Sequence, residues 1–402
     1  VSRMLERIFN GSKLYWAWVI LLLCLIGMGV GAYINQLNNG LILTGMSRDI
    51  SWGLYIGQMA FFVGVAASGI MVAIPFYLHD YKTFQPVLIF GEFMAVAAVL
   101  VAVLFVIIDL GFPARVFNMI LFPTPTAIVF WDVVVLSSYL IVNLIIGWTA
   151  IQCERKGCKP PKWAHYLAIF AIPLAVSIHT VTAFLYSGMP GRSYFLTAIM
   201  AGRFLSSAFA AGPALLIIIC FIMRGTEAFK VSDKAIDSLA KVVAYAMIVN
   251  VFFFLCEFYT AFYSNIPGPM APIEYLFVGL KGVDGLVPFM WEAAIFAFAG
   301  IALLLFKKTR RCHPILIIAL IMVFLACYLD KGVGLVLGGF VPNSFGDVTG
   351  YIPAPNELMI IVGVYAIGLF VLTMLYKVTT DVRKRVAQGT TPTDVELAEA
   401  KE

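Results

Sequence analysis

Charged residues are scarce in this sequence. Only 12% of its 402 residues are Asp, Glu, Lys or Arg, whereas 62% are hydrophobic. In soluble domains about a quarter of the residues are charged. The composition therefore excludes an ordinary water-soluble fold and favours a chain embedded in lipid.

Histidine is also rare, and the cysteines form no metal-binding motif. The chain has 4 histidines and 7 cysteines. Only His179 lies inside a long apolar run, which excludes a haem held by two histidines that face each other across helices. No C-x-x-C pair occurs, and Cys153 and Cys158 alone make a poor metal site. We therefore expect no haem, no iron–sulfur cluster and no metal ion in this chain.

Long apolar runs dominate the sequence. A membrane-spanning helix needs roughly 20 mostly apolar residues, and ten runs meet this length, the ninth being interrupted by Asp330 and Lys331. They cover residues 14–36, 55–78, 86–108, 127–151, 163–186, 196–222, 240–262, 286–306, 314–337 and 356–377. The first run is too long for the apolar part of a secretory signal peptide. We expect an all-α polytopic membrane protein, with a transmembrane domain over residues 1–377 and a polar, disordered cytoplasmic tail over residues 378–402.

Lysine and arginine are distributed unevenly over the connections. Twenty lie in the two terminal segments and the even-numbered connections, whereas the odd-numbered connections carry five: Arg48, Arg115, Arg192, Lys281 and Lys331. Cytoplasmic loops of membrane proteins carry an excess of Lys and Arg. This asymmetry predicts a multi-pass protein of the cytoplasmic membrane with both termini in the cytoplasm. The net charge of +5 therefore reflects the orientation of the protein in the membrane and does not indicate a nucleic-acid-binding surface.

Polar residues within the spans gather toward the outer ends of the helices. Trp52, Tyr55 and Gln58 are spaced by three residues, which places them on one helix face. Such residues form either an aromatic belt at the membrane surface or the lip of a binding site. Because ionisable residues inside spans are costly and usually functional, we expect the deeper polar residues to mark a cavity. These are Gln58, Asp132, His179, Arg203, Glu257 and Glu292.

Two similar dipeptides suggest an internal duplication. Trp131-Asp132 opens the fourth span and Trp291-Glu292 opens the eighth. A shift of four helices preserves their direction, so we expect two four-helix bundles, made of helices 2–5 and 6–9, related as parallel repeats. The first and tenth spans flank these bundles.

Several segments resemble the NrfD/PsrC-like integral membrane subunits. The similarity covers most of the chain and lies in ISWGLYIGQMAFFVGVAASG (50–69), IDLGFPARVF (108–117), FWDVVVLSSYL (130–140), SIHTVTAFLYSGMPGR (177–192), EFYTAFYS (257–264) and PNELMIIVGVYAIG (355–368). The ten-span form is most similar to the DsrP, HmcC and HybB members. The resemblance implies a haem-free subunit that exchanges electrons between menaquinol or menaquinone and a ferredoxin-like, extracytoplasmic iron–sulfur subunit. It also implies further cytochrome and membrane subunits, and a role in sulfur or sulfate respiration.

The resemblance places a quinone near the outer face, between the first helices. A quinone needs apolar walls and hydrogen-bonding groups at its two carbonyls. Since histidine exchanges protons near neutral pH, we predict His179 as the catalytic group, with Asp132 or Asp109 orienting it or sharing its proton. The predicted quinone-binding residues are Tyr33, Asn35, Gln36, Trp52, Tyr55, Gln58, Arg115 and Trp131. An ion pair with Asp109 is the alternative role for Arg115.

Proton coupling would need polar residues across the apolar interior. One string of candidates contains Glu92, Asn143, Ser177, His179 and Asp132, and a second contains Asn250, Glu257, Glu292 and Asp330. Alternatively, these residues only join the helices through hydrogen bonds. A secondary transporter and a passive membrane anchor for redox partners are the alternative functions.

Overall fold

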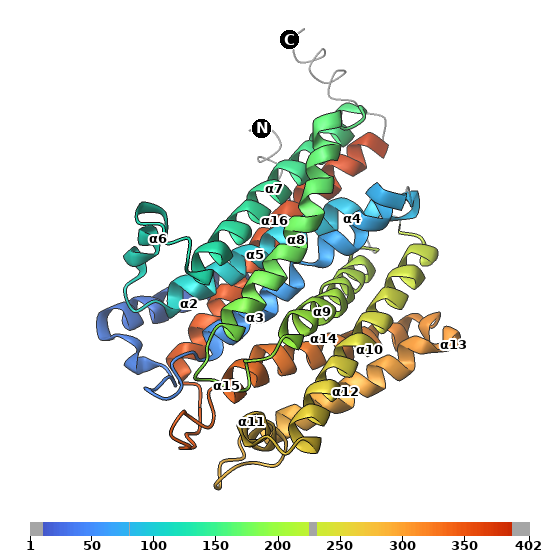
Figure 1. Ribbon diagram of the computed structural model, residues 1–402. Helices are drawn as coiled ribbons and strands as arrows, with labels where there is room; N and C mark the ends of the chain where they lie inside the picture. Colours follow the sequence, from blue (N-terminus) through green and yellow to red (C-terminus); the bar gives the residue numbers. More distant parts are fainter. Residues whose placement is uncertain (1–10, 80, 225–230, 388–402) are drawn as a thin grey trace.

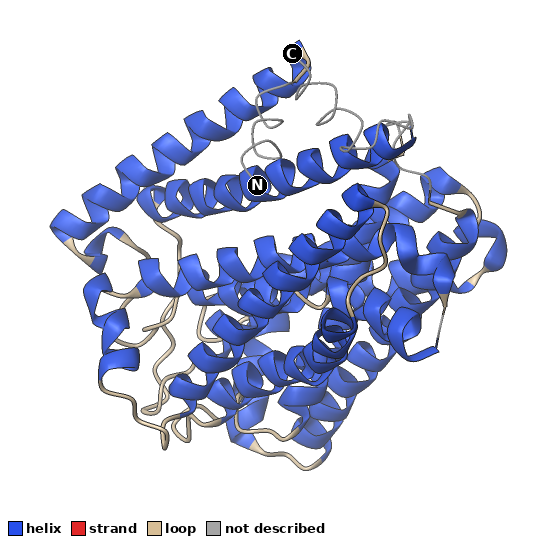
Figure 2. Cartoon of the chain, turned by 90° about the horizontal axis from the view of Figure 1, so that it is seen from above, coloured by secondary structure: helices blue, strands red, loops and turns tan. Residues whose placement is uncertain are grey.

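The computed structural model describes residues 11–79, 81–224 and 231–387, and this part of the chain is helical with no strand (Figures 1 and 2). It contains ten helices long and apolar enough to cross a membrane, which confirms the predicted fold class. They are α2 (Lys13–Asn39), α3 (Leu54–Val65) with α4 (Ser68–His79), α5 (Gln85–Asp109), α7 (Ile128–Lys156), α8 (Lys162–Ser187), α9 (Ile199–Met223), α10 (Asp233–Tyr263), α12 (Val287–Leu305), α14 (His313–Cys327) with η5 (Tyr328–Leu335) and α15 (Val336–Gly339), and α16 (Pro355–Ala387).

Short helices occupy several connections. They are η2 (Leu41–Leu43), η3 (Lys82–Phe84), η4 (Pro113–Phe117), α6 (Asn118–Leu121), α11 (Pro267–Phe277) and α13 (Lys307–Arg310). We call the end of the molecule where α2 begins the basic end, and the end where α2 finishes the opposite end. The last helix, α16, extends to Ala387, so residues 378–387 are helical, in contrast to the predicted tail. Residues 388–402 of that tail lie outside the described residues.

Two four-helix bundles form the centre of the molecule, as the repeated dipeptides predict (Figure 1). In the first bundle, α3 and α4 pack against α5, α5 against α7, α7 against α8, and α8 against α4. In the second, α9 packs against α10, α10 against α12, α12 against α14, and α14 against α9. The indole N–H of Trp131 donates to the Pro125 carbonyl at 2.8 Å, and that of Trp291 donates to the Phe277 carbonyl at 2.9 Å. The fourth and eighth spans therefore begin with the same kind of anchor.

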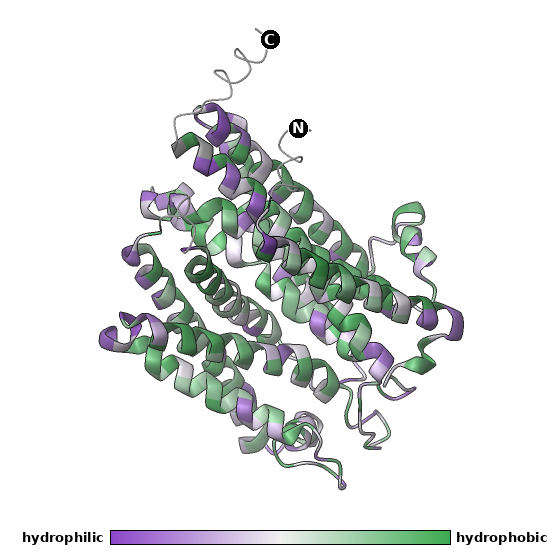
Figure 3. Ribbon diagram, turned by 180° about the vertical axis from the view of Figure 1, so that it is seen from behind, coloured by the Kyte–Doolittle hydropathy of each residue, from purple (hydrophilic) through white to green (hydrophobic). Residues whose placement is uncertain are grey.

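The first and last spans pair with each other, and the last span, α16, also packs on α5. The two helices approach closely at Gly29 and Gly363, where a Cβ added to either glycine would lie 2.6 Å from the Cα of the other. Only glycine permits two membrane helices to approach this closely. The outer face of α2 is apolar, with Leu14 and Ile20 exposed. The long helices are mostly hydrophobic along their length, and hydrophilic residues gather near their ends, as a lipid environment requires (Figure 3).

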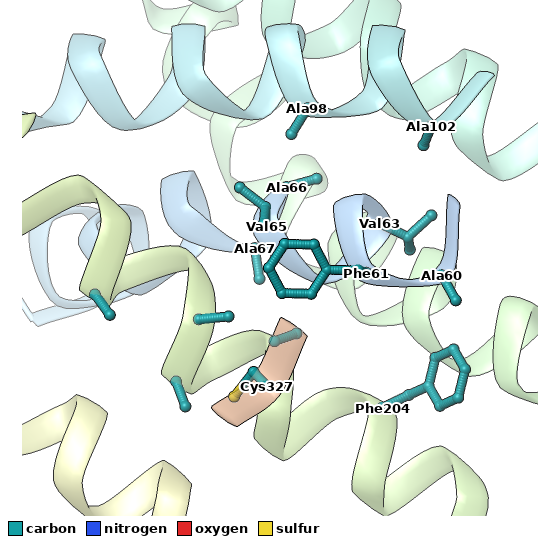
Figure 4. Close-up of a cluster of buried hydrophobic side chains, with 14 of the residues drawn as sticks. Ala60, Phe61, Val63, Val65, Ala66, Ala67, Ala98, Ala102, Phe204 and Cys327 are labelled. Atoms are coloured by element: carbon teal, nitrogen blue, oxygen red, sulfur yellow. The ribbon is translucent and has the colours of Figure 1, made fainter. Parts of the chain in front are cut away.

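The two bundles meet where α3 packs against α9 and η5. Ala60 and Ala67 lie here beside the large rings of Phe61 and Phe204, and all four are buried (Figure 4). A Cβ on Gly57 would lie 2.3 Å from a carbonyl of η5. Small residues on α3 thus bring its backbone directly against the π-helical segment.

The second span is interrupted between α3 and α4. Helix breaks within membranes are tolerated when neighbouring groups bond the backbone atoms that the break leaves free. Here the Tyr139 hydroxyl of α7 donates to the Ala66 carbonyl at 3.1 Å. A buried hydroxyl of α7 therefore bonds a carbonyl at the break.

Candidate functional site

Two side chains of α3 tie the opposite end of the first bundle to the flanking helices. The Tyr55 hydroxyl donates to Gln36 Oε1 at 2.8 Å, and Gln36 Nε2 donates to a carbonyl in the last turn of α5 at 2.8 Å. One turn further along α3, Gln58 Oε1 accepts from the Tyr365 hydroxyl at 2.5 Å, and Gln58 Nε2 donates to the Gly332 carbonyl at 2.9 Å. Both glutamines are buried. These groups are therefore engaged in bracing α3 against its neighbours.

Two carboxylates lie beside these braces. Glu357, near the start of α16, accepts from the Gly45 N–H at 2.8 Å and from the Tyr351 hydroxyl. Burial and the Glu357 carboxylate raise the pKa of Tyr351, which keeps its hydroxyl available as a donor. In contrast, Asp109 Oδ1 and the Tyr33 hydroxyl are buried and have no hydrogen-bond partner within the described residues. Because buried polar atoms usually have partners, these two groups are available to a ligand.

A second polar set lies inside the first bundle, where α8 faces α3 and α7. The side chain of His179 is 1% exposed, and neither ring nitrogen has a hydrogen-bond partner in the described part of the chain. One turn along α8, the Thr182 hydroxyl donates to Asp132 Oδ1 at 2.6 Å. The Tyr186 hydroxyl donates to a carbonyl of α3 at 3.4 Å, and the Trp52 ring packs edge-on against Tyr186 with the centroids 5.6 Å apart. We call these five residues the histidine cluster.

The second bundle holds buried ion pairs. Arg203 Nη1 of α9 donates to Glu257 Oε2 of α10 at 2.5 Å, and its Nη2 donates to Asp330 Oδ1 at 3.0 Å. Lys331 donates to the Phe204 carbonyl at 3.0 Å and lies 3.9 Å from the centre of that ring. Arg203 and Lys331 are each 3% exposed. Buried charges are tolerated when they are paired, and we call Arg203, Glu257, Asp330 and Lys331 the charge cluster.

The π-helix η5 connects the braces to the charge cluster. Such wide turns inside α-helices frequently occur at functional sites. Tyr328 lies with its hydroxyl 3.3 Å from that of a tyrosine of α16, Gly332 accepts the bond from α3, and Asp330 joins the charge cluster. One segment therefore contacts both the braces and the charge cluster.

Two cavities lie in the first bundle between this region and the basic end. The narrower one is lined by Tyr77, Glu92, Tyr139 and Asn143, among others. Glu92 Oε2 is buried without a partner within residues 11–387 as described, and Asn143 Nδ2 donates to the Tyr139 carbonyl at 2.8 Å. Tyr77 also lines the larger cavity, of ≈630 Å³, at the basic end. The two cavities adjoin, since both are lined by Tyr77 and Ile146.

A third cavity, of ≈100 Å³, lies in the second bundle between α10, α12 and α14. Its walls are mostly apolar, including Phe254, Phe277 and Met290, and Asn250 and Asp330 supply its polar groups. Among the described residues, no three His, Cys, Asp or Glu side chains gather in a way that could hold a metal ion.

Several predicted site residues lie apart from these sets. Arg115 is exposed and packs over the Phe112 ring at 5.6 Å, and within the described residues it makes no ion pair with Asp109. Asn35, Trp131 and Glu292 are also exposed, whereas Ser177 is half-buried. The Ser177 hydroxyl donates to a carbonyl of its own helix at 2.8 Å. Ser177 is therefore bonded within its own helix, and Glu292 lines none of the three cavities described above.

Sequence reasoning alone misses some functional candidates. The charge pattern counts Lys331 with an odd-numbered loop, yet this residue is buried, because the π-helix carries it into the bundle. The interruption of the ninth apolar run by two adjacent charges is the signal that could identify it. Tyr186, Tyr365 and Glu357 are absent from the predicted site, since tyrosines and acids near helix ends are equally typical of a membrane surface.

Residues 42–329 match the protein family described as "Polysulphide reductase, NrfD". A putative dimethyl sulfoxide reductase membrane protein of Halobacterium salinarum is 25% identical over 389 residues, covering 89% of each chain. An Hdr-like menaquinol oxidoreductase integral membrane subunit of Archaeoglobus fulgidus is 24% identical over 95% of this chain and 98% of its own length. A selenate reductase subunit of Mesobacillus selenatarsenatis is 23% identical over 63% of this chain and 66% of its own length.

Proposed function

Because the chain belongs to the NrfD polysulphide reductase family, we propose that it is a haem-free, quinone-reactive membrane subunit of a respiratory oxidoreductase complex. It passes electrons between menaquinol and an iron–sulfur partner subunit, and menaquinone is an exchangeable substrate. The names of its relatives support this, since they describe subunits of two reductases and of a menaquinol oxidoreductase. The ten apolar spans would give it direct access to a lipid-soluble substrate.

The observation that carries the proposal is the state of His179, which is buried with both ring nitrogens unpaired in the described part of the chain. A neutral imidazole has one donor and one acceptor nitrogen, and burying both without partners is costly. A quinol hydroxyl can donate to the acceptor nitrogen, and a quinone carbonyl can accept from the donor nitrogen. His179 therefore fits both forms of the substrate and can take its proton during oxidation.

The surroundings of His179 suit an aromatic ring with polar substituents. Trp52 and Tyr186 provide flat apolar surface, which quinone sites require. Asp132, fixed by the Thr182 hydroxyl at 2.6 Å, is the next proton acceptor toward the opposite end. Gln36, Tyr55 and Gln58 position α3 rather than contact the substrate, while Tyr33 and Asp109 line the approach from α2 and α5. Menaquinol oxidation releases two electrons to the partner and two protons, and His179 and Asp132 would receive the protons in turn.

The basic end faces the cytoplasm in this proposal. The burial of Lys331 removes one charge from the loops of the opposite end, so those loops retain only Arg48, Arg115, Arg192 and Lys281. This change strengthens the charge asymmetry on which the orientation rests. The histidine cluster then lies in the outer half of the bilayer.

The iron–sulfur partner docks on the opposite end in this orientation. Its contacts are the odd-numbered connections 109–126, 187–195 and 263–285, which lie at the end of the molecule toward which we place the quinone. The first of these loops carries η4 and α6, which project from the molecule (Figure 1). Its large apolar side chains are exposed; they are Phe112, Phe117, Ile120, Leu121 and Phe122. Exposed apolar patches of this kind mark protein or membrane contacts.

Proton coupling is a further element of the proposal. Glu92 and Asn143 line the cavity that adjoins the basic end, so Glu92 is the residue through which protons would be taken up from the cytoplasm. Asn250, Asp330 and Glu257 form the corresponding candidates in the second bundle, where Arg203 joins the two acids. Sulfur or sulfate respiration is the proposed setting, supported by the similarity of the ten-span form to DsrP-like subunits.

A secondary transporter is the alternative that one observation favours. The ninth span is broken by η5, next to buried charges, and transporters bind substrates at such breaks. A transporter would move its substrate in liposomes without any partner subunit, whereas an electron-transfer subunit would not.

Purification tests the main proposal. The isolated subunit is expected to retain menaquinone and to show neither a haem Soret band nor iron, and stoichiometric haem would contradict the proposal. Reporter fusions at Lys159 and Lys308 should report cytoplasm, and fusions at Gly191 and Gly282 the outside. Two reversals in this set would overturn the orientation, and with it the placement of the partner.

A further inference from the structure

The cavity of ≈630 Å³ at the basic end of the first bundle has an apolar floor and a cationic rim, and proton uptake requires neither. We propose that it binds an anionic phospholipid, with the phosphate at its rim and the start of an acyl chain on its floor. The proposal uses residues that the redox site does not, and it holds whether or not the subunit reacts with quinone.

The floor of this cavity is apolar. Leu88 and Ile89 of α5, Ile146 of α7 and Ala164 of α8 line it and are buried. The volume falls within the range of about 300–1,000 Å³ that is usual for small-molecule sites. A water-soluble anion would gain nothing from such walls, whereas an acyl chain would bury apolar surface against them.

The rim of the cavity is cationic. Lys159 and Lys162 line it, both are exposed, and neither forms an ion pair or hydrogen bond with another described residue. The one carboxylate of the lining, Glu154, receives two hydrogen bonds from Arg383, at 2.9 and 2.8 Å. That pair neutralises the acid and leaves the two lysines with an uncompensated positive charge. His165 also lines the rim and offers a further nitrogen donor.

The position of the cavity favours a lipid. It lies between the end of α7 and the start of α8, at the level where spans meet the membrane surface. Tyr166 lines the cavity, Trp163 follows the lining residue Lys162 in the sequence, and these two aromatic residues are 68% and 52% exposed. Such aromatic residues sit at the headgroup level. Basic pockets between transmembrane helices bind anionic headgroups. Charge, apolar floor and depth therefore point to the same ligand.

Lipid titration of the delipidated protein tests the site. Native mass spectrometry should show phosphatidylglycerol binding more tightly than phosphatidylcholine with the same acyl chains.

The double variant Lys159→Gln/Lys162→Gln should lower the affinity for phosphatidylglycerol about thirtyfold, from the usual contribution of two lysines near an anionic membrane. The matched double variant Lys307→Gln/Lys308→Gln, in exposed lysines of the other bundle, should keep the wild-type affinity. Ala150→Leu, which fills the floor and keeps the charges, should also weaken binding.

Thiol labelling of the wild-type protein locates the lipid without relying on variants. Cys158 lines the cavity and is exposed, and Cys312 is an exposed cysteine in a different connection at the basic end. Phosphatidylglycerol should slow maleimide labelling of Cys158 and leave the labelling of Cys312 unchanged.

Three outcomes would overturn the proposal. They are equal binding of the two lipids, unchanged affinity in the Lys159→Gln/Lys162→Gln variant, and equal protection of Cys158 by millimolar inorganic phosphate, which would identify a site for a soluble anion.

Discussion

The two four-helix bundles bury polar residues in different ways. In the first bundle, Glu92 and His179 have buried atoms without partners in the described part of the chain, and Asp132 bonds a neutral hydroxyl. In the second bundle, Arg203 bonds both Glu257 and Asp330. A paired charge is fixed by its partner, whereas an unpaired group remains available to a ligand or a proton. In our proposal the chemistry therefore takes place in the first bundle, and the ion pairs of the second bundle have a structural role.

Two residues at the same position in α3 and α9 show this difference between the bundles. Gln58 is the fifth residue of α3, Arg203 is the fifth residue of α9, and each follows a glycine. Both bind η5, Gln58 through the Gly332 carbonyl and Arg203 through Asp330. The two helices therefore make corresponding contacts with η5, α3 through a neutral hydrogen bond and α9 through a charged one.

The largest expected effect is on the stability of the second bundle. Arg203→Met removes the buried cation that pairs with Glu257 and Asp330, whose side chains are 11% and 18% exposed. Breaking a buried pair costs about 3–5 kcal/mol. We expect the purified variant to melt far below the wild type, or to fail to accumulate in the membrane. The exposed Lys308→Met should melt like the wild type. Equal melting of Arg203→Met and the wild type would show that the second bundle does not depend on its ion pairs.

The next effect is on catalysis in the first bundle. His179→Ala should lower menaquinol oxidation in the assembled complex by about a hundredfold or more, because a positioned acid–base group contributes about 10²–10⁴-fold. Its melting temperature should stay close to that of the wild type, since His179 makes no hydrogen bond with described residues. His79→Ala, in an exposed residue at the basic end, serves as the control. Normal turnover in His179→Ala would remove the proposed quinone site.

A smaller loss is expected from Asp132→Asn. The amide still bonds the Thr182 hydroxyl but cannot receive a proton, so menaquinol oxidation should fall about tenfold, equivalent to about 1.4 kcal/mol of barrier. Stability should change little. We would measure the rates of the Asp132→Asn variant and the wild type in the same complex. If the variant lost stability but kept its rate, Asp132 would be a structural residue.

The smallest effect on turnover is expected from Glu92→Gln. Uncoupled menaquinol oxidation should be unchanged, while any proton translocation in liposomes should decrease, because the glutamine cannot carry a proton from the basic end. Full translocation in this variant would exclude Glu92 from proton uptake.

Much of the fold follows from the sequence alone. Apolar runs of roughly 20 residues define the spans, and the Trp131-Asp132 and Trp291-Glu292 pairs reveal the two bundles, since each indole anchors the start of a span. Asp132 bonds Thr182 on the helix that carries His179, and a common site of Asp132 and His179 stays a prediction. These features depend on composition and order along the chain, which a sequence records directly.

Other features depend on contacts that the sequence does not record. Glu292 is exposed because the neighbours of a helix decide which of its faces is buried, and apolar residues on all sides of the helix leave that choice open in the sequence. The burial of Lys331 requires a π-helical turn, which has no clear sequence pattern. The contact of Gln58 with Gly332 joins residues 274 positions apart, so only the folded chain shows it.

Photolabelling with an azido derivative of menaquinone tests the central claim most directly. If the first bundle holds the substrate, mass spectrometry should find the label on residues 52–58 and 178–186, and His179→Ala should reduce the labelling. Label confined to residues 247–255 and 290–298, around the cavity of the second bundle, would contradict the assignment of quinone chemistry to the first bundle.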